Sequence, residues 1–91
     1  MPDIYNDENL RKNKVAREEI DQIMRSHSSL WLPLTKSRRG NERTMVIGFT
    51  LTGRILEVGI EIMSDVEETL FYFHVMDAGK TYRKKFGELN K

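Results

Sequence analysis

Apolar residues recur along this chain with two different periods, and the change of period separates a helical N-terminal part from the segment that follows. Residues 16–27 predict a helix, because their apolar side chains recur three and four positions apart. That stripe consists of Ile20, Ile23, Met24 and His27. A shorter helix is predicted over residues 7–11, where Asn6 is a suitable N-cap. A third, basic helix is predicted over residues 81–89.

Between the second and third helices, apolar and polar residues alternate, which is typical of β-strands. Strands are predicted over residues 30–32, 44–50, 54–62 and 68–76, with turns at 51–53 and 63–67. Pro33 follows the first of these strands, and a proline fits the edge of a sheet better than its centre. The order of elements predicts an α+β fold, with two N-terminal helices, a three- to four-stranded antiparallel meander and a C-terminal helix. We expect the helices to pack on one face of the meander.

The alternation also predicts which face of the sheet is buried. One row is almost purely apolar and should carry the core: Met45, Ile47, Phe49, Leu56, Val58, Ile60, Ile62, Phe71, Phe73 and Val75. The other row mixes polar and apolar residues: Thr44, Val46, Glu57, Glu61, Tyr72 and His74. We expect this second row to form an open face, where rigid strands can carry a polar site.

Length and composition narrow the class of protein. The 91 residues fit one domain, which we place at residues 1–91. The chain has no cysteine, which excludes a disulfide scaffold, thiolate catalysis and cysteine-bound metal centres. No apolar run approaches the roughly 20 residues of a membrane-spanning helix, and no signal peptide opens the chain, so we expect a cytoplasmic protein without a membrane partner. The two histidines lack the spacing of a metal site, and we expect neither a metal nor another cofactor.

The net charge of +1 conceals an uneven distribution along the chain. Residues 36–54 carry a net charge of +4, residues 55–77 carry −6 and residues 78–91 carry +4. Clustered cations can bind phosphate groups even when the whole chain is balanced, and the two cationic segments would form one patch if the fold brought them together. The alternative is that these blocks are solvated faces that pair with each other.

Three groups of residues occur in an order and spacing that resemble a known family. The first is Asn9 to Val15 followed by Glu18-Glu19-Ile20, similar to a helix–Lys-His-Gly-Val–helix opening. The second is Arg39-Gly-Asn-Glu-Arg43, Ile47-Gly48 and Thr52-Gly53-Arg54, similar to a Glu-x-Arg strand, an Ile-Gly pair and a Gly-Arg hairpin. The third is His74-Val-Met-Asp-Ala78 with Arg83-Lys-Lys-Phe86, similar to a last strand ending in Ala-Arg and a basic helix closing on tyrosine. Together they resemble the BrnT family of bacterial toxins, small ribonucleases of type II toxin–antitoxin systems with a fold related to the RelE-type toxins.

The resemblance implies a RelE/BrnT-like fold and a metal-independent ribonuclease that is held by a cognate antitoxin. It implies Glu42 as the base that activates the ribose 2′-hydroxyl, and Arg43 and Arg54 as the cations that stabilise the pentavalent phosphate. The last strand of the family commonly ends in an arginine thought to serve cleavage, and this chain has Met76 at that position. His74, two residues earlier and on the same side of its strand, is the nearest replacement.

The same residues admit a second function, a catalytically inactive BrnT-like module that binds a protein or a nucleic acid. The family's His-Gly pair before the second helix is Asn13-Lys14 here, a further departure. His74 is then a sheet residue that is hydrogen-bonded to a cross-strand glutamate, Glu57 or Glu61, instead of a general acid or base.

The cationic side chains and Trp31 are candidates for partner contacts. Six cations are candidate contacts to an RNA backbone, with mobile or solvated charges as the alternative: Lys36, Arg38, Arg39, Lys80, Arg83 and Lys84. Trp31 either packs over the second helix or, if exposed, anchors a partner protein. A homodimer is the default expectation for a small domain with an edge strand.

Overall fold

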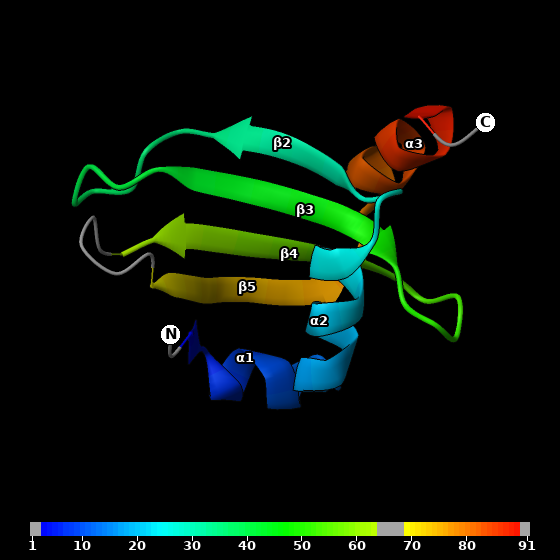
Figure 1. The fold of residues 1–91 in the computed structure, drawn as a ribbon, viewed down its shortest axis with the longest axis horizontal. Coiled ribbons are helices and arrows are strands. Elements are labelled where there is room, and N and C mark those ends of the chain that lie inside the picture. The colour runs from blue at the N-terminus through cyan, green and yellow to red at the C-terminus, as the bar shows by residue number, and fades with distance from the viewer. Residues whose placement is uncertain (1–2, 64–68, 90–91) are drawn as a thin grey trace.

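The computed structural model describes residues 3–63 and 69–89, and within these ranges it contains five strands and three helices (Figure 1). In chain order the elements are β1 (Ile4–Tyr5), α1 (Asp7–Lys12), α2 (Arg17–Arg25), β2 (Leu30–Leu34), β3 (Arg43–Phe49), β4 (Ile55–Ile62), β5 (Leu70–Asp77) and α3 (Lys80–Leu89). The α+β class predicted from the sequence is confirmed. The turn predicted over residues 63–67 lies, apart from Met63, outside the described residues.

The strands form a single sheet in the order β1-β5-β4-β3-β2. Neighbours from β2 to β5 are antiparallel, but β1 pairs with β5 in parallel. The sheet is therefore mixed and five-stranded, whereas a purely antiparallel meander of three or four strands was expected. The sequence did not predict β1 because its two residues are too few to show an alternation. β2 continues through Pro33 and lies at one edge of the sheet. Proline lacks a backbone N–H, and an edge strand tolerates this because only one of its sides is hydrogen-bonded to a neighbouring strand.

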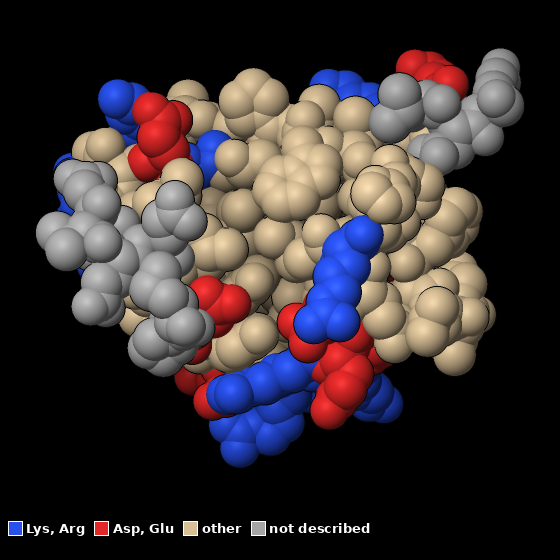
Figure 2. Space-filling view, in the orientation of Figure 1, with Lys and Arg blue, Asp and Glu red and all other residues tan. Residues whose placement is uncertain are grey.

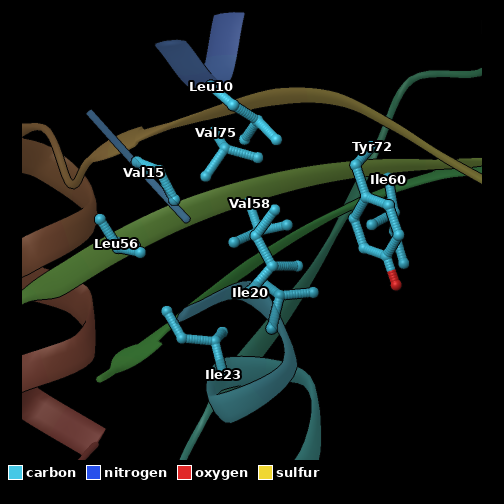
Figure 3. Packing of buried hydrophobic residues seen from close by; sticks show 10 residues of the cluster. Leu10, Val15, Ile20, Ile23, Leu56, Val58, Ile60, Tyr72 and Val75 are labelled. Atoms are coloured by element: carbon cyan, nitrogen blue, oxygen red, sulfur yellow. The ribbon is translucent and has the colours of Figure 1, made fainter. Parts of the chain in front are cut away.

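The helices cover both faces of the sheet, not one face as expected. α1 and α2 enclose the main core, and α2 crosses in front of the sheet in Figure 1. Figure 3 shows this core, which consists of Leu10, Val15, Ile20, Ile23, Val46, Leu56, Val58, Ile60, Tyr72 and Val75. α3 packs on the opposite face through a smaller core of Met45, Ile47, Ala78 and Phe86. None of the helices in the described ranges is long and apolar enough to cross a membrane.

The pairing of β3 with β4 overturns the predicted assignment of the two faces. Val46 pairs with Val58, so Val46 lies in the main core and Met45 points to the opposite face. The residues wrongly assigned to the main core are Met45, Ile47, Phe49, Phe71 and Phe73, and those wrongly assigned to the predicted open face are Thr44, Val46 and Tyr72. Ile62 lies on the predicted face but is exposed instead of buried in the core. Alternation fixes the faces within one strand, but the phase between strands is set by the turn, which closes where the Thr50 N–H donates to the Arg54 carbonyl at 2.8 Å.

The N-terminal helices begin as their local sequence predicts. The Asn6 side chain caps α1 by accepting a hydrogen bond from the Asn9 N–H at 3.2 Å. At the start of α2, the Glu19 carboxylate accepts a hydrogen bond from the Ala16 N–H at 3.0 Å. α2 ends at Arg25, so His27 lies beyond the helix in an exposed turn.

Candidate functional site

The face of the sheet opposite α1 and α2 carries a group of polar and aromatic side chains, and we call it the open face. Its members are Arg43, Glu57, Glu61, Phe71, Phe73, His74 and Met76. α3 covers the part of this face near the β3–β4 hairpin through Phe86, which contacts Phe49 edge to face with ring centroids 4.8 Å apart. The partly exposed aromatic residues Phe71 and Phe73 lie on β5, apart from that contact.

A β-bulge in β5 places two consecutive side chains on the open face. Gly59 pairs with His74 and Ile60 pairs with Tyr72, so Phe73 has no partner in the ladder. A Cβ on Gly59 would lie 2.8 Å from the Cζ atom of Phe73, which means that the ring occupies the space left by the glycine. Phe73 and His74 are therefore neighbours on one face, although strict alternation predicted opposite faces.

His74 and Glu57 form a hydrogen-bonded pair at the centre of the open face. The Nε2 atom of His74 lies 2.8 Å from Oε2 of Glu57, and the other carboxylate oxygen accepts a hydrogen bond from the Gly79 N–H at 2.7 Å. Glu57 is buried, at 6% exposure, whereas the His74 side chain is 30% exposed. An ionised carboxylate favours the tautomer with the proton on Nε2, which leaves Nδ1 as an acceptor of a proton. Nδ1 has no hydrogen-bond partner among the described residues.

A second buried carboxylate, Glu61, holds the loop that precedes β3. Its Oε2 atom accepts hydrogen bonds from Nδ2 of Asn41 at 2.8 Å and from Nη2 of Arg39 at 3.3 Å. The hydrogen bond from Asn41, supported by Ser37 and by the charge of Arg39, holds the pKa of Glu61 below its ordinary value against the opposing effect of burial. The loop closes on itself where the Ser37 N–H donates to the Asn41 carbonyl at 2.9 Å, and Gly40 supplies the left-handed turn with φ +80°.

Arg43 lies between that loop and the aromatic residues. Its Nε and Nη2 atoms donate to the carbonyl and hydroxyl oxygens of Thr35 at 2.7 and 3.1 Å. The guanidinium carbon lies 5.5 Å from the ring centroid of Phe73. Nη1 is not used in any contact that the structure gives for this part of the chain, so the fixed guanidinium retains a donor for an anion.

Arg54 has a different environment from the other predicted catalytic residues. Its guanidinium pairs with Asp77 and donates to the backbone carbonyls of Asn13 and Lys14, which connect α1 to α2. The hydrogen bond to Asp77 is the main cause of a raised pKa for Arg54 and of a lowered pKa for Asp77. These partners lie on the side of the sheet that α1 and α2 cover, so the structure does not bring Arg54 together with His74 and Arg43.

Glu42 and the remaining predicted cations lie on exposed segments. Glu42 precedes β3 and pairs with Lys36 at 3.5 Å, and both side chains are about two-thirds exposed. Arg38 makes no ion pair among the described residues. Lys80, Arg83 and Lys84 are exposed on α3. β5 runs from its start beside the loop of residues 35–42 to its end at α3 (Figure 1). The cations of that loop and those of α3 therefore lie at opposite ends of the sheet and do not merge into one patch.

Charged side chains are also unevenly distributed on the face of the sheet that α1 and α2 cover. Figure 2 shows a wide area without charged side chains over β2 and β3, and charged side chains gathered toward α1 and the start of α2. Trp31 of the edge strand β2 is 47% exposed and has Val46 as its strand partner. It is therefore exposed at the sheet edge instead of buried over α2.

Of the residues that the sequence suggested, the structure brings His74 and Arg43 onto one face. Glu57, one of the two glutamates expected beside His74, is its hydrogen-bond partner. Sequence reasoning missed Phe73, because the bulge interrupts the alternation on which the prediction rested. The one available signal was Gly59, since a glycine in the middle of a strand often marks a bulge or a close approach.

Comparison of the chain with protein-family models and with curated proteins gives no significant match in either case. Among the described residues, no group of three or more His, Asp and Glu side chains is arranged to hold a metal ion. The side chains on the open face can supply acid–base chemistry by a histidine, next to a guanidinium group and aromatic rings.

Proposed function

We propose that this protein binds RNA on the open face and cleaves it without a metal ion, as a BrnT-like toxin that a cognate antitoxin restrains. The observation that carries the proposal is the His74–Glu57 pair, whose Nε2–Oε2 distance is 2.8 Å. It supplies an oriented, partly exposed imidazole on a rigid strand, next to Phe73 and within the same face as Arg43. Glu57 acts as the positioning residue, since it holds the ring from its buried side.

The proposed reaction uses this chain's residues in two roles. Nδ1 of His74 takes the proton of a ribose 2′-hydroxyl, whose oxygen then bonds to the adjacent phosphorus. The bond from phosphorus to the 5′-oxygen breaks, and that oxygen leaves with a proton from solvent or from the histidine. Arg43 stabilises the negative charge on the pentavalent phosphate. Compared with the expectation from the family motifs, His74 replaces Glu42 as the base and Arg43 is retained.

One backbone angle lends the family resemblance support that is independent of the site. Lys14 has φ +54°, the left-handed conformation that glycine adopts most readily. It stands where the family's Lys-His-Gly-Val motif has its glycine. Glycine, the residue that the family has at this position, would adopt this backbone conformation without strain, although this chain has a lysine there.

The test is cleavage of an unstructured RNA oligonucleotide by the purified protein in the presence of EDTA. We expect His74→Ala and His74→Gln to lower the cleavage rate at least roughly 100-fold, the usual contribution of a general base. His27→Ala is the matched control, because His27 lies in an exposed turn away from the open face. Intact RNA at micromolar wild-type protein, or equal rates for the His74 and His27 variants, would overturn the proposed catalysis.

The second candidate function is a non-catalytic module of the same kind, which binds a protein partner. Three observations favour it. The hydrogen bond between His74 and the cross-strand Glu57 is also the contact expected of a structural sheet histidine. Met76 pairs with Glu57 on the open face and supplies no charge there, and Trp31 is exposed at the sheet edge. An exposed tryptophan is a frequent anchor of protein interfaces. Uncleaved RNA together with a stable complex with a basic protein encoded by a neighbouring gene, weakened by Trp31→Ala, would establish this function instead.

A further inference from the structure

We infer that Phe73 is a base-stacking residue and that the nucleic acid taken by the open face is single-stranded RNA. The base of the nucleotide whose 2′-hydroxyl lies at His74 stacks on the ring of Phe73. This inference deepens the proposed function and rests on the open face as its RNA site. It names the substrate class and a residue that selects it.

The bulge in β5 gives the open face a geometry that regular alternation cannot give. Because Phe73 has no partner in the ladder, its side chain and that of His74 emerge side by side toward the same solvent. In a nucleotide, base and phosphate are likewise adjacent groups on one ribose. A ring for the base and an imidazole for the ribose hydroxyl thus occur at neighbouring positions.

The ring of Phe73 is packed at one end and partly exposed at the other. Gly59 leaves the space that the Cζ and Cε2 atoms occupy, so the ring is packed at that end. Phe73 nevertheless remains partly exposed, and Phe71, tilted by 54° at 6.3 Å between centroids, does not stack on it. An aromatic ring that serves only to cover a glycine has a structural role and needs no polar groups beside its exposed part. Here the guanidinium carbon of Arg43 lies 5.5 Å from the ring centroid, and His74 is the next residue along the strand.

A stacking ring also restricts the form of the RNA. A base can stack on a protein ring only when it is not stacked within a duplex, and aromatic residues on sheets read splayed, single-stranded bases. Arg43, which lies beside the ring, and Arg39, which pairs with Glu61 on the same face, are suited to the phosphates of the bound strand. Phe73 therefore selects single strands and loops over paired segments.

The experiment measures binding apart from cleavage. A fluorescent, single-stranded 2′-O-methyl oligonucleotide, which lacks a free 2′-hydroxyl, is titrated with the protein and followed by anisotropy. We expect Phe73→Leu to weaken binding at least roughly fivefold, Phe73→Tyr to change it less than twofold and Phe73→Trp to tighten it. Phe49→Leu is the matched control, since Phe49 is 44% exposed on the same face but contacts Phe86. A duplex of the same sequence should bind more weakly than the single strand.

The outcomes separate this inference from the proposed function. Equal affinity of wild type and Phe73→Leu overturns the stacking role, whether or not His74 is needed for cleavage. Phe73-dependent binding without any His74-dependent cleavage overturns the catalytic proposal and supports the stacking role. If Phe73→Leu does not fold, Phe73→Trp decides, because unchanged or weaker binding by the larger ring overturns the inference.

Discussion

Arg54 and Asp77 form a two-point ion pair, with Nε 2.6 Å from Oδ1 and Nη2 3.3 Å from Oδ2. The same guanidinium donates to the carbonyls of Lys14 at 2.7 Å and Asn13 at 2.8 Å. One side chain just before β4 thus joins the end of β5 to the segment between α1 and α2. A residue that the sequence suggested as a catalytic cation is, in its contacts, a tie between the sheet and the N-terminal helices.

We therefore expect Arg54→Ala to lower the free energy of unfolding by about 2–3 kcal/mol, because it leaves two backbone carbonyls and a carboxylate without their donor. Urea denaturation followed by circular dichroism measures the change. Arg38→Ala is the control and should alter stability by less than about 0.5 kcal/mol, since Arg38 is exposed. A folded Arg54→Ala protein of unchanged stability that no longer cleaves RNA would instead restore Arg54 to the catalytic set.

Glu61 predicts a pH dependence of stability. The hydrogen bond from Asn41 is the main cause that lowers the pKa of Glu61 in the folded protein. Ionisation of Glu61 therefore stabilises the folded state relative to the unfolded chain. This stabilisation is present above the pKa of the unfolded chain, about 4.3, and is lost as the pH falls through the lower folded value. Glu61→Gln should therefore be less stable than wild type at pH 7, by about 1 kcal/mol, and the difference should shrink at pH 3.

Urea denaturation at the two pH values measures this difference, with Glu42→Gln as the exposed control. The control should match wild type within about 0.5 kcal/mol at both pH values, as expected for a solvent-exposed ion pair. A constant deficit of Glu61→Gln at pH 7 and pH 3 would contradict the role assigned to the ionised carboxylate.

The sequence predicted the elements of this fold better than their arrangement. The helices and the long strands were located to within about two residues, because their periodicity and caps are local properties. The faces were not, since the phase of β3 against β4 depends on the closure of the Thr50–Arg54 turn, and one step of register exchanges core and surface. The short strand β1 depends on its pairing with β5, which leaves no periodic trace in two residues.

The site shows the same division between local and tertiary information. His74 was identified because its residue type and strand position are visible in the sequence, and its partner Glu57 was one of two choices. The role of Arg54 could not be predicted, because its carbonyl partners are 40 and 41 residues away in the chain. Phe73 was missed because a bulge is a property of the pairing between two strands.

Lys14 carries a conformational cost that a single substitution should remove. With φ +54°, it lies in the left-handed region, where a side chain with a Cβ costs about 1 kcal/mol. Lys14→Gly should therefore raise the free energy of unfolding by about 0.5–1 kcal/mol while the Arg54 contact to the Lys14 carbonyl persists. Lys12→Gly is the matched control and should be destabilising, because Lys12 lies within α1. Equal destabilisation by both substitutions would contradict this account of the α1–α2 connection.

Met76→Arg tests whether the missing cation limits the proposed ribonuclease. Met76 pairs with Glu57 across β4 and β5, so an arginine there projects onto the open face two residues from His74. If catalysis lacks only this cation, the cleavage rate should rise at least roughly tenfold, because a guanidinium would stabilise charge on the phosphate. Met76→Leu is the control for shape and should leave the rate unchanged.

The same position also offers the new arginine a competing partner. Glu57 accepts hydrogen bonds from His74 and from the Gly79 N–H, and an arginine at position 76 can take the place of the histidine in this group. A rate that falls below that of Met76→Leu would mean that the pairing of Glu57 with His74 matters more than an added cation. Equal rates for Met76→Arg, Met76→Leu and wild type would mean that position 76 has no part in the reaction, and that any comparison with the family's arginine at this position is misplaced.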